Sequence, residues 1–299
     1  GGALKVSQGL STAYPERTWG TPISEAGITG LAAGLALRGL RPVVEIMFGD
    51  FLTLTADQVI NHISKFSWMY SGGKALEDQV SVPMVIRTPM GGRRGYGPTH
   101  SQTLEKIFLG TPGLRIVAPS GLATNQLDSP GGLLSQAILD DPLPVLFIEN
   151  KLQYLLPVHE SPDLGDWELL SNLQIDGPQA GSEARGYPTD TLRLRGAPAA
   201  QISLAAYGYM VEMARQAIEE LAYKHEIFAE LVAPSQLAPL PTPGQSDIHD
   251  PLAPLFDSLQ RTGRLLVIEE GNLSFGWGAE VLARSVERLS LRAAGRVAG

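Results

Sequence analysis

Residues 42–47 read PVVEIM, and three stretches of the same kind follow: PMVIRT at 83–88, LRIVA at 114–118 and PVLFIE at 144–149. Each stretch is short, mostly apolar and rich in β-branched side chains, and glycine or proline lies beside it. Apolar runs with little polar alternation are typical of strands that are buried on both faces of a parallel sheet. The four stretches therefore predict a parallel sheet in the first half of the chain.

Helical segments alternate with these strands. Residues 24–40 are small and apolar, and residues 51–69 place apolar side chains at alternating steps of four and three before Ser71-Gly72-Gly73 ends the pattern. The order strand, helix, strand, helix predicts a doubly wound α/β domain.

The pattern changes between residues 156 and 200, which are rich in Pro, Gly, Asp and Ser and predict a linker or surface crossover. Alternating strands and helices then return from residue 201 onward. We therefore expect three parts: an α/β domain at 1–155, a linker at 156–200, and a second α/β domain at 201–299 that looks incomplete at its end.

Composition and charge narrow the function classes. The 299 residues are 43% apolar and 18% charged with a net charge of −8, which fits a soluble globular protein and disfavours binding to nucleic acid. The chain has no cysteine, so thiolate metal sites and cysteine nucleophiles are excluded. No long apolar run or signal peptide is present, so we expect no membrane segment and a cytoplasmic location.

Glu25 is the first candidate site residue. It lies in the run Thr-Pro-Ile-Ser-Glu-Ala-Gly at 21–27, at the start of an apolar helix, where a carboxylate also serves as an ordinary helix cap. The residues after it are small and apolar, so we expect this helix to be buried. A buried carboxyl group without a partner tends to keep its proton, which is the state that a proton-donating catalytic group needs.

His100 is the second candidate. It follows Pro98-Thr99 at a predicted loop-to-helix junction after a strand, where active-site groups collect in open α/β sheets. The glycine-rich loop at 91–97 precedes it and could bring backbone N–H groups to an anion, although a flexible loop with solvated arginines explains it equally well. None of the five histidines is paired with another at metal-ligand spacing.

Several motifs in order resemble one known family. They are 21–27 (TPISEAG), 40–51 (LRPVVEIMFGDF), 57–62 (DQVINH), 85–89 (VIRTP), 97–102 (GPTHSQ), 112–120 (PGLRIVAPS), 268–271 (IEEG) and 276–280 (GWGAE). Together they resemble the beta subunit of the thiamine-diphosphate-dependent decarboxylating component of pyruvate, acetoin and branched-chain 2-oxoacid dehydrogenases. The resemblance implies a transketolase-like pyrimidine-binding domain followed by a C-terminal α/β domain.

The resemblance also implies roles for three residues. Glu25 would bond the ring nitrogen N1′ of the cofactor's aminopyrimidine, Phe51 would pack on that pyrimidine, and His100 would position the reacting group or the lipoyl arm. The reaction implied is oxidative decarboxylation of a 2-oxoacid with transfer of the acyl group to a lipoyl group. Some members of the family hold K⁺, and the matching positions here are Met84, Ala137, Ile138 and Asp140, the first three through their carbonyls.

Partners follow from the same resemblance. The chain lacks the Gly-Asp-Gly motif that marks the half of these enzymes that binds diphosphate and Mg²⁺. We therefore expect an alpha subunit that holds Mg²⁺, an α₂β₂ heterotetramer, a lipoyl acyltransferase core and a small 2-oxoacid substrate. The residues of the motifs resemble the pyruvate or acetoin type more than the branched-chain type.

Two other functions stay open at this point. One is a different thiamine enzyme half that does not use a lipoyl acceptor. The other is a truncated, non-catalytic assembly module, because both ends of the chain look cut. Glu25, Phe51 and His100 together favour the dehydrogenase.

Overall fold

The computed structural model describes residues 4–71, 80–172, 186–241 and 249–295, and the chain divides into two compact units. The first unit comprises Gly1–Ile116 and Leu134–Leu155. The second comprises Val117–Leu133 and Leu156–Gly299.

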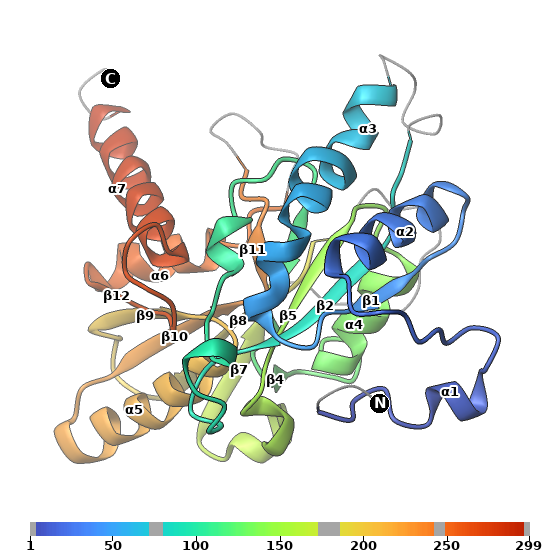
Figure 1. Cartoon of the computed structure of the whole chain (residues 1–299). Coiled ribbons are helices and arrows are strands. Elements are labelled where there is room, and N and C mark those ends of the chain that lie inside the picture. Colours follow the sequence, from blue (N-terminus) through green and yellow to red (C-terminus); the bar gives the residue numbers. More distant parts are fainter. Residues whose placement is uncertain (1–3, 72–79, 173–185, 242–248, 296–299) are drawn as a thin grey trace. The chain divides into compact units, whose positions relative to one another are not determined.

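The first unit is built on a sheet in which four strands lie side by side (Figure 1). Their order is β1 (Val43–Glu45), β2 (Val85–Met90), β5 (Val145–Asn150) and β3 (Arg115–Val117). Both β1 and β5 run parallel to β2, and all six residues of β2 are buried, as in the centre of a parallel sheet. The parallel sheet predicted from the four apolar stretches is confirmed.

Helix α2 (Glu25–Leu37) packs beside this sheet and buries only small side chains, among them Ala32, Ala33 and Ala36. Its first turn is a different environment, because Ala26 and Gly27 are exposed and Glu25 is half-buried. The expectation that the whole helix is buried was therefore wrong for its N-terminal turn. Beyond that turn the helix is buried on one face only, since Leu31 and Leu37 are exposed while Ala32, Ala33 and Ala36 are buried.

Residues 49–71 are helical throughout but change pitch twice. They form the 3₁₀ helix η1 (Gly49–Thr55), the π-helix η2 (Gln58–Ile63) and the α-helix α3 (Ser64–Ser71), whereas the sequence predicted one regular helix from Phe51 to Met69. Hydroxyl groups mark both changes: Thr55 bonds the Leu52 carbonyl and Ser64 bonds the Ile60 carbonyl. Such side-chain bonds compete with the regular helical ladder.

A buried charged network crosses this sheet. Arg87 of β2 donates to Glu45 of β1 and to Glu149 of β5, and Tyr154 donates to the same Glu149 carboxylate at 2.8 Å. Burial raises the pKa of Glu149 and outweighs the lowering effect of Arg87. The network accounts for the charged residues inside otherwise apolar strands, because each buried charge has a partner. The shorter elements of this unit are α1 (Leu10–Ala13), η4 (Pro98–His100), η5 (Glu105–Ile107) and η6 (Gln153–Leu155).

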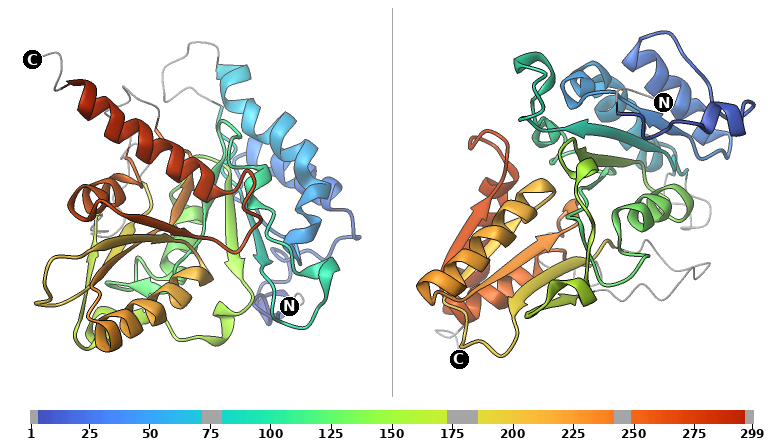
Figure 2. Two further views of the ribbon diagram at one scale, coloured as in Figure 1. Left: turned by 90° about the vertical axis from the view of Figure 1, so that its left-hand side faces the viewer. Right: turned by 90° about the horizontal axis from the view of Figure 1, so that it is seen from below.

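The second unit has a mixed sheet of five strands, which can be followed in Figure 2. Their order is β12 (Leu265–Ile268), β9 (Ile202–Ala206), β10 (Ala229–Pro234), β8 (Thr189–Leu194) and β7 (Trp167–Ser171). Strands β12, β9 and β10 are parallel, while β8 is antiparallel to both of its neighbours.

Helices cover both faces of this second sheet. Leu204 of β9 packs in one buried cluster with Ile218 of α5 (Tyr209–His225), whereas Ser203 bonds Ser258 of α6 (Ala253–Thr262). Because neighbouring residues of a strand face opposite ways, α5 and α6 lie on opposite faces. The remaining elements are β4 (Leu122–Ala123), β6 (His159–Glu160), η7 (Ser161–Leu164), α4 (Pro130–Leu139), β11 (Gln236–Ala238) and α7 (Trp277–Gly295).

The predicted linker at 156–200 is corrected by this sheet, because it contains β7 and β8. Leu169 and Leu192 of these strands are buried, and they alternate with polar residues that gave the segment its loop-like composition. Residues 173–185 within the predicted linker lie outside the described residues. None of the helices in the described ranges is long and apolar enough to cross a bilayer.

Candidate functional site

Glu25 is the first residue of α2, and Ser24 caps that helix by accepting a hydrogen bond from the Gly27 N–H at 3.4 Å. The cap fixes where the helix begins and so where the Glu25 side chain leaves it. The carboxylate forms no hydrogen bond or ion pair with any residue in the described ranges. Ser24 therefore serves as the cap, and the Glu25 carboxylate is left for another partner.

Phe51 lies in η1, the segment against which α2 packs. Gly49 at the start of η1 makes this position possible, because a Cβ there would lie 2.3 Å from the Cγ of Met90 on β2. Phe51 is half-buried, so part of its ring surface is open. The close approach of η1 to β2 thus depends on a residue without a side chain.

His100 ends the short turn η4, which follows Gly97 in a backbone conformation that only glycine adopts readily, with φ 70° and ψ −173°. Its imidazole lies edge-on to two phenyl rings, with centroid distances of 4.6 Å to Phe48 and 5.4 Å to Phe51. The Thr99 hydroxyl is 2.8 Å from its Nδ1. The structure therefore brings together Phe51 and His100, two of the three residues for which the resemblance implied roles.

Three residues near His100 were missed by the sequence analysis. Phe48 packs on the imidazole, Asp50 accepts hydrogen bonds from Gln102, and Lys151 follows directly after β5 with its ammonium group on the His100 carbonyl. Asp50 and Lys151 follow the carboxyl ends of β1 and β5, where functional groups gather in parallel sheets. That position after a strand of the parallel sheet is the signal in the sequence that could have identified them.

The glycine-rich loop at 91–97 contributes an aromatic ring to this cluster. The Tyr96 ring lies 5.3 Å from that of Phe48, centroid to centroid. The loop thereby contacts the aromatic cluster through a side chain, in addition to any role of its backbone N–H groups.

These residues fit the aminopyrimidine half of thiamine diphosphate. An aminopyrimidine offers a ring nitrogen for a carboxyl group and a flat face for an aromatic side chain. Glu25 has a carboxylate without a protein partner among the described residues, and Phe51 has a half-open ring in the segment beside the same helix. Within the same described ranges, no three His, Asp or Glu side chains are grouped so as to hold a metal ion.

The positions predicted to hold potassium have a different environment. Arg41 donates through Nη1 to the carbonyls of Ile138, at 3.1 Å, and of Asp141, at 2.9 Å, while the Met84 carbonyl accepts from the Val145 N–H. Arg115 lies 2.8 Å from the buried Asp141 carboxylate. Arg41 thus already donates to one of the predicted carbonyl ligands, that of Ile138, and the potassium site stays a prediction from which we derive no step.

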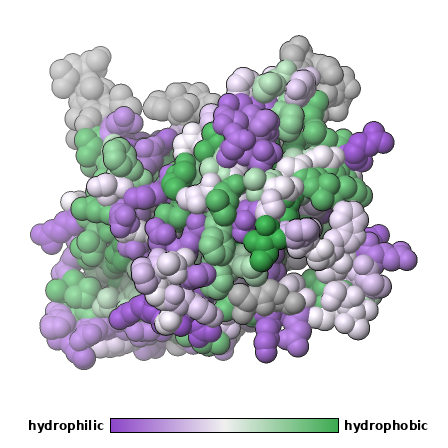
Figure 3. All heavy atoms as spheres, viewed as in Figure 1, coloured by the Kyte–Doolittle hydropathy of each residue, from purple (hydrophilic) through white to green (hydrophobic). Residues whose placement is uncertain are grey.

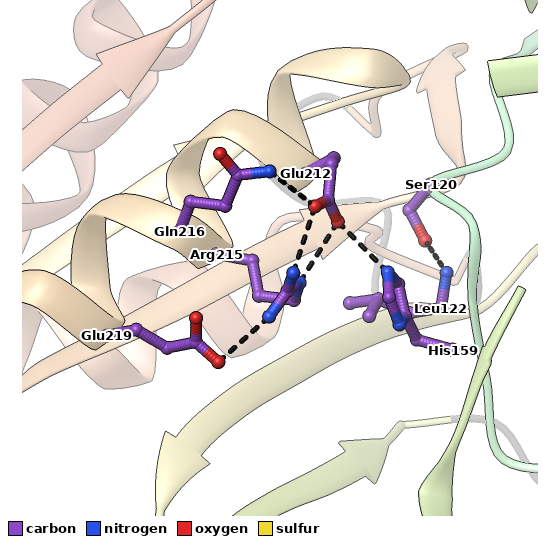
Figure 4. A network of polar contacts seen from close by, with 7 residues as sticks. All are labelled: Ser120, Leu122, His159, Glu212, Arg215, Gln216 and Glu219. Atoms are coloured by element: carbon purple, nitrogen blue, oxygen red, sulfur yellow. Dashed lines mark hydrogen bonds and ion pairs between the residues drawn. The ribbon is translucent and has the colours of Figure 1, made fainter. Parts of the chain in front are cut away.

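A second polar cluster lies in the second unit and involves His159 (Figure 4). The Glu212 carboxylate contacts His159 Nε2 at 3.0 Å and accepts two hydrogen bonds from Arg215 and one from Gln216. Burial acts to raise the pKa of Glu212, but these hydrogen bonds hold it below its usual value. The charges are mutually satisfied, so the cluster joins β6 to the first turn of α5 and does not resemble a catalytic site.

Two family models match the chain. "Transketolase, pyrimidine binding domain" covers residues 1–155, and "Transketolase, C-terminal domain" covers residues 193–298.

Relatives of known name match over most of the chain. It is 36% identical over 287 residues to the pyruvate dehydrogenase E1 component subunit beta-2, mitochondrial, of Oryza sativa subsp. japonica, covering 96% of this chain and 66% of that protein. It is 35% identical to the acetoin:2,6-dichlorophenolindophenol oxidoreductase subunit beta of Bacillus subtilis (strain 168), covering 91% and 67%. It is 32% identical to the 2-oxoisovalerate dehydrogenase subunit beta of Pseudomonas aeruginosa, covering 95% and 73%.

The chain thus spans about two thirds of the length of the first two of these relatives. Among solved structures, a chain described as "Split gene transketolase, inactive beta4 tetramer" superimposes with a TM-score of 0.61 at 19% identity, covering 95% of this chain and 75% of that one. This likeness confirms the predicted transketolase-like α/β fold.

Proposed function

We propose that this chain is the subunit that activates thiamine diphosphate in a 2-oxoacid dehydrogenase. The chain belongs to the family of transketolase-like E1 beta subunits of these enzymes. The observation that carries the proposal is the Glu25 carboxylate, which has no protein partner among the described residues and lies at the start of α2, the helix that packs against the Phe51 segment. The reaction proposed is oxidative decarboxylation of a 2-oxoacid, with transfer of the acyl group to a lipoyl arm.

Each residue of the site would have a distinct task. Glu25 would hold a proton against the ring nitrogen N1′ of the pyrimidine, and the Ser24 cap would keep that carboxyl group in place. Phe51 would support the pyrimidine face. His100 would position the reacting group or the lipoyl arm, its ring held by Phe48 and Thr99. When bound, thiamine diphosphate supplies the electron sink that makes decarboxylation possible.

A partner chain is part of the proposal. This half would bind the pyrimidine, and an alpha subunit would supply the diphosphate and Mg²⁺ site within an α₂β₂ assembly that docks on a lipoyl acyltransferase core. Exposed apolar side chains support a partner: Trp68, Met69 and Tyr70 at the end of α3 are 61%, 52% and 55% exposed. Figure 3 shows hydrophobic residues reaching the surface among hydrophilic ones on this side of the molecule.

The substrate class is proposed as 2-oxoacids, with pyruvate first, and acetoin or branched-chain 2-oxoacids as the alternatives. Relatives of all three kinds are similarly identical to the chain, at 36%, 35% and 32%, so comparison does not rank them. The cytoplasmic location also stays a prediction, since relatives that are mitochondrial by name match as well.

The test is a comparison of Glu25→Gln with the wild type in the complex with its alpha subunit. Turnover of pyruvate, acetoin and a branched-chain 2-oxoacid would be followed with a dye acceptor, with and without thiamine diphosphate. We expect Glu25→Gln to lower kcat by about 100-fold to 10,000-fold, because an amide cannot take part in the proton transfer. Glu16→Gln is the matched control, since Glu16 is an exposed glutamate before α2, and it should leave kcat unchanged.

Wild-type turnover that survives Glu25→Gln would refute the proposed role of Glu25. An intact complex that turns over none of the three substrates would favour the alternative of a non-catalytic assembly module.

A further inference from the structure

Lys151 is a fully buried lysine, with a relative exposure of 0%. It directly follows β5, and its backbone N–H donates to the Met90 carbonyl at the end of β2, at 3.0 Å. The backbone at this point is thus fixed by the sheet. The side chain must then leave the sheet in a set direction, toward the turn that carries His100.

The ammonium group of Lys151 lies in a site made for a cation. It donates to the carbonyl of His100, and it lies 5.3 Å from the ring centroid of Phe48 and 5.5 Å from that of Tyr96. Burial of an ammonium group is costly unless hydrogen bonds and aromatic faces offset the lost water. A methionine of similar length could fill this place without that cost, so the presence of a lysine indicates that the charged donor has a role.

The turn that carries His100 has little structure of its own. It is a 3₁₀ turn of three residues, Pro98–His100, and such turns hold poorly aligned hydrogen bonds. On its other side, the Asp50 carboxylate accepts hydrogen bonds from Gln102, from Nε2 at 2.9 Å and from the backbone N–H at 3.4 Å. The Lys151 ammonium group thus binds the segment at residue 100, and the Asp50 carboxylate binds it at residue 102.

We propose that Lys151 is a positioning residue that fixes the His100 imidazole between Phe48 and Phe51 through the His100 carbonyl. The catalytic consequence rests on the proposed function, in which His100 acts on the reacting group. The positioning itself does not, because it follows from the contacts of Lys151 alone.

The first readout is structural and does not depend on activity. Histidine labelled with ¹³C at Cε1 gives five ring signals for the five histidines, and the His100→Gln variant identifies that of His100. In the full chain bound to unlabelled alpha subunit, we expect Lys151→Met to shift or broaden the His100 signal while the other four stay in place. Lys151→Arg, which keeps a charged donor, should restore it, and Lys65→Met on α3 should have no effect.

The second readout is kinetic and uses a double-mutant cycle. Lys151→Met should lower kcat with a lipoyl acceptor by about 100-fold, the cost of a displacement near 1 Å, and leave the KM for the 2-oxoacid nearly unchanged. In a His100→Gln background, the same substitution should cost less than about threefold, because coupled residues are not additive.

An unmoved His100 signal in Lys151→Met would overturn the proposal, as would full additivity in the cycle. If Lys151→Met does not fold, Lys151→Gln is used instead. Its amide is uncharged and its side chain is one atom shorter than that of lysine, so the His100 signal should still shift, and an unmoved signal would overturn the proposal. A shifted His100 signal in a complex without thiamine-dependent turnover would instead leave Lys151 as a positioning residue and refute the proposed function.

Discussion

Replacing Asp190 with asparagine should stabilise the second unit at pH 8 and change its stability little at pH 4. Asp190 lies on β8 and is 1% exposed, and its Oδ1 has no hydrogen-bond partner among the described residues. Burial, and then the neighbouring carboxylate of Asp128, raise the pKa of Asp190 to about 8, against a partly compensating hydrogen bond from Ser171. The Asp128 carboxylate has its own donors, the N–H groups of Thr124 and Asn125.

The sign and size of the effect follow from proton linkage. An aspartate in the unfolded chain has a pKa of 3.8, so between pH 4 and pH 8 the folded chain holds one proton that the unfolded chain has released. The free energy of unfolding therefore falls as the pH rises from about 4 to about 8, by about 1.4 kcal/mol per pH unit and by at most about 6 kcal/mol in all. The amide introduced by Asp190→Asn does not titrate in this range and carries no charge beside Asp128, so this slope should disappear in the variant.

Hydrogen exchange of the β8 and β10 amides measures the opening free energy of this unit, after correction for the pH dependence of intrinsic exchange. Wild type, Asp190→Asn and the exposed control Asp163→Asn would be compared from pH 5 to pH 8. Parallel slopes for wild type and Asp190→Asn would refute the reasoning, because they would show that Asp190 is already ionised in the folded protein below pH 5.

Two further predictions concern core packing and Arg41, which donates to carbonyls at the end of α4. Ile218→Ala should destabilise the second unit by about 2–5 kcal/mol, because Ile218 of α5 is fully buried against the sheet. The control Val286→Ala, on the exposed side of α7, should cost under about 0.5 kcal/mol. Urea unfolding measures both changes. Arg41→Leu should cost about 1 kcal/mol by thermal unfolding, because it removes the donor to two carbonyls. The wild type should melt at the same temperature in KCl and in NaCl of equal ionic strength. Specific stabilisation of the wild type by KCl would show that a potassium ion binds despite Arg41.

Local patterns predicted most of the regular elements. The run at 144–149 predicted β5, and the small apolar stretch at 24–40 predicted α2, since both signals depend on residues that are neighbours in the chain. The prediction failed where strands carried alternating polar residues among Pro and Gly, as in β7 and β8. These strands form because Leu169 and Leu192 reach a core made by residues far away in the sequence.

The sequence by itself determined the family, the two α/β parts and the identity of Glu25, Phe51 and His100 as candidates, because motifs and periodicity are local features. Only the tertiary structure decided what surrounds His100. Lys151 is 51 residues from His100 and Asp50 is 52 residues from Gln102, and no local pattern links them. In the sheet β1 and β5 lie on either side of β2, and the residues that follow their carboxyl ends place Asp50 and Lys151 against the segment that carries His100.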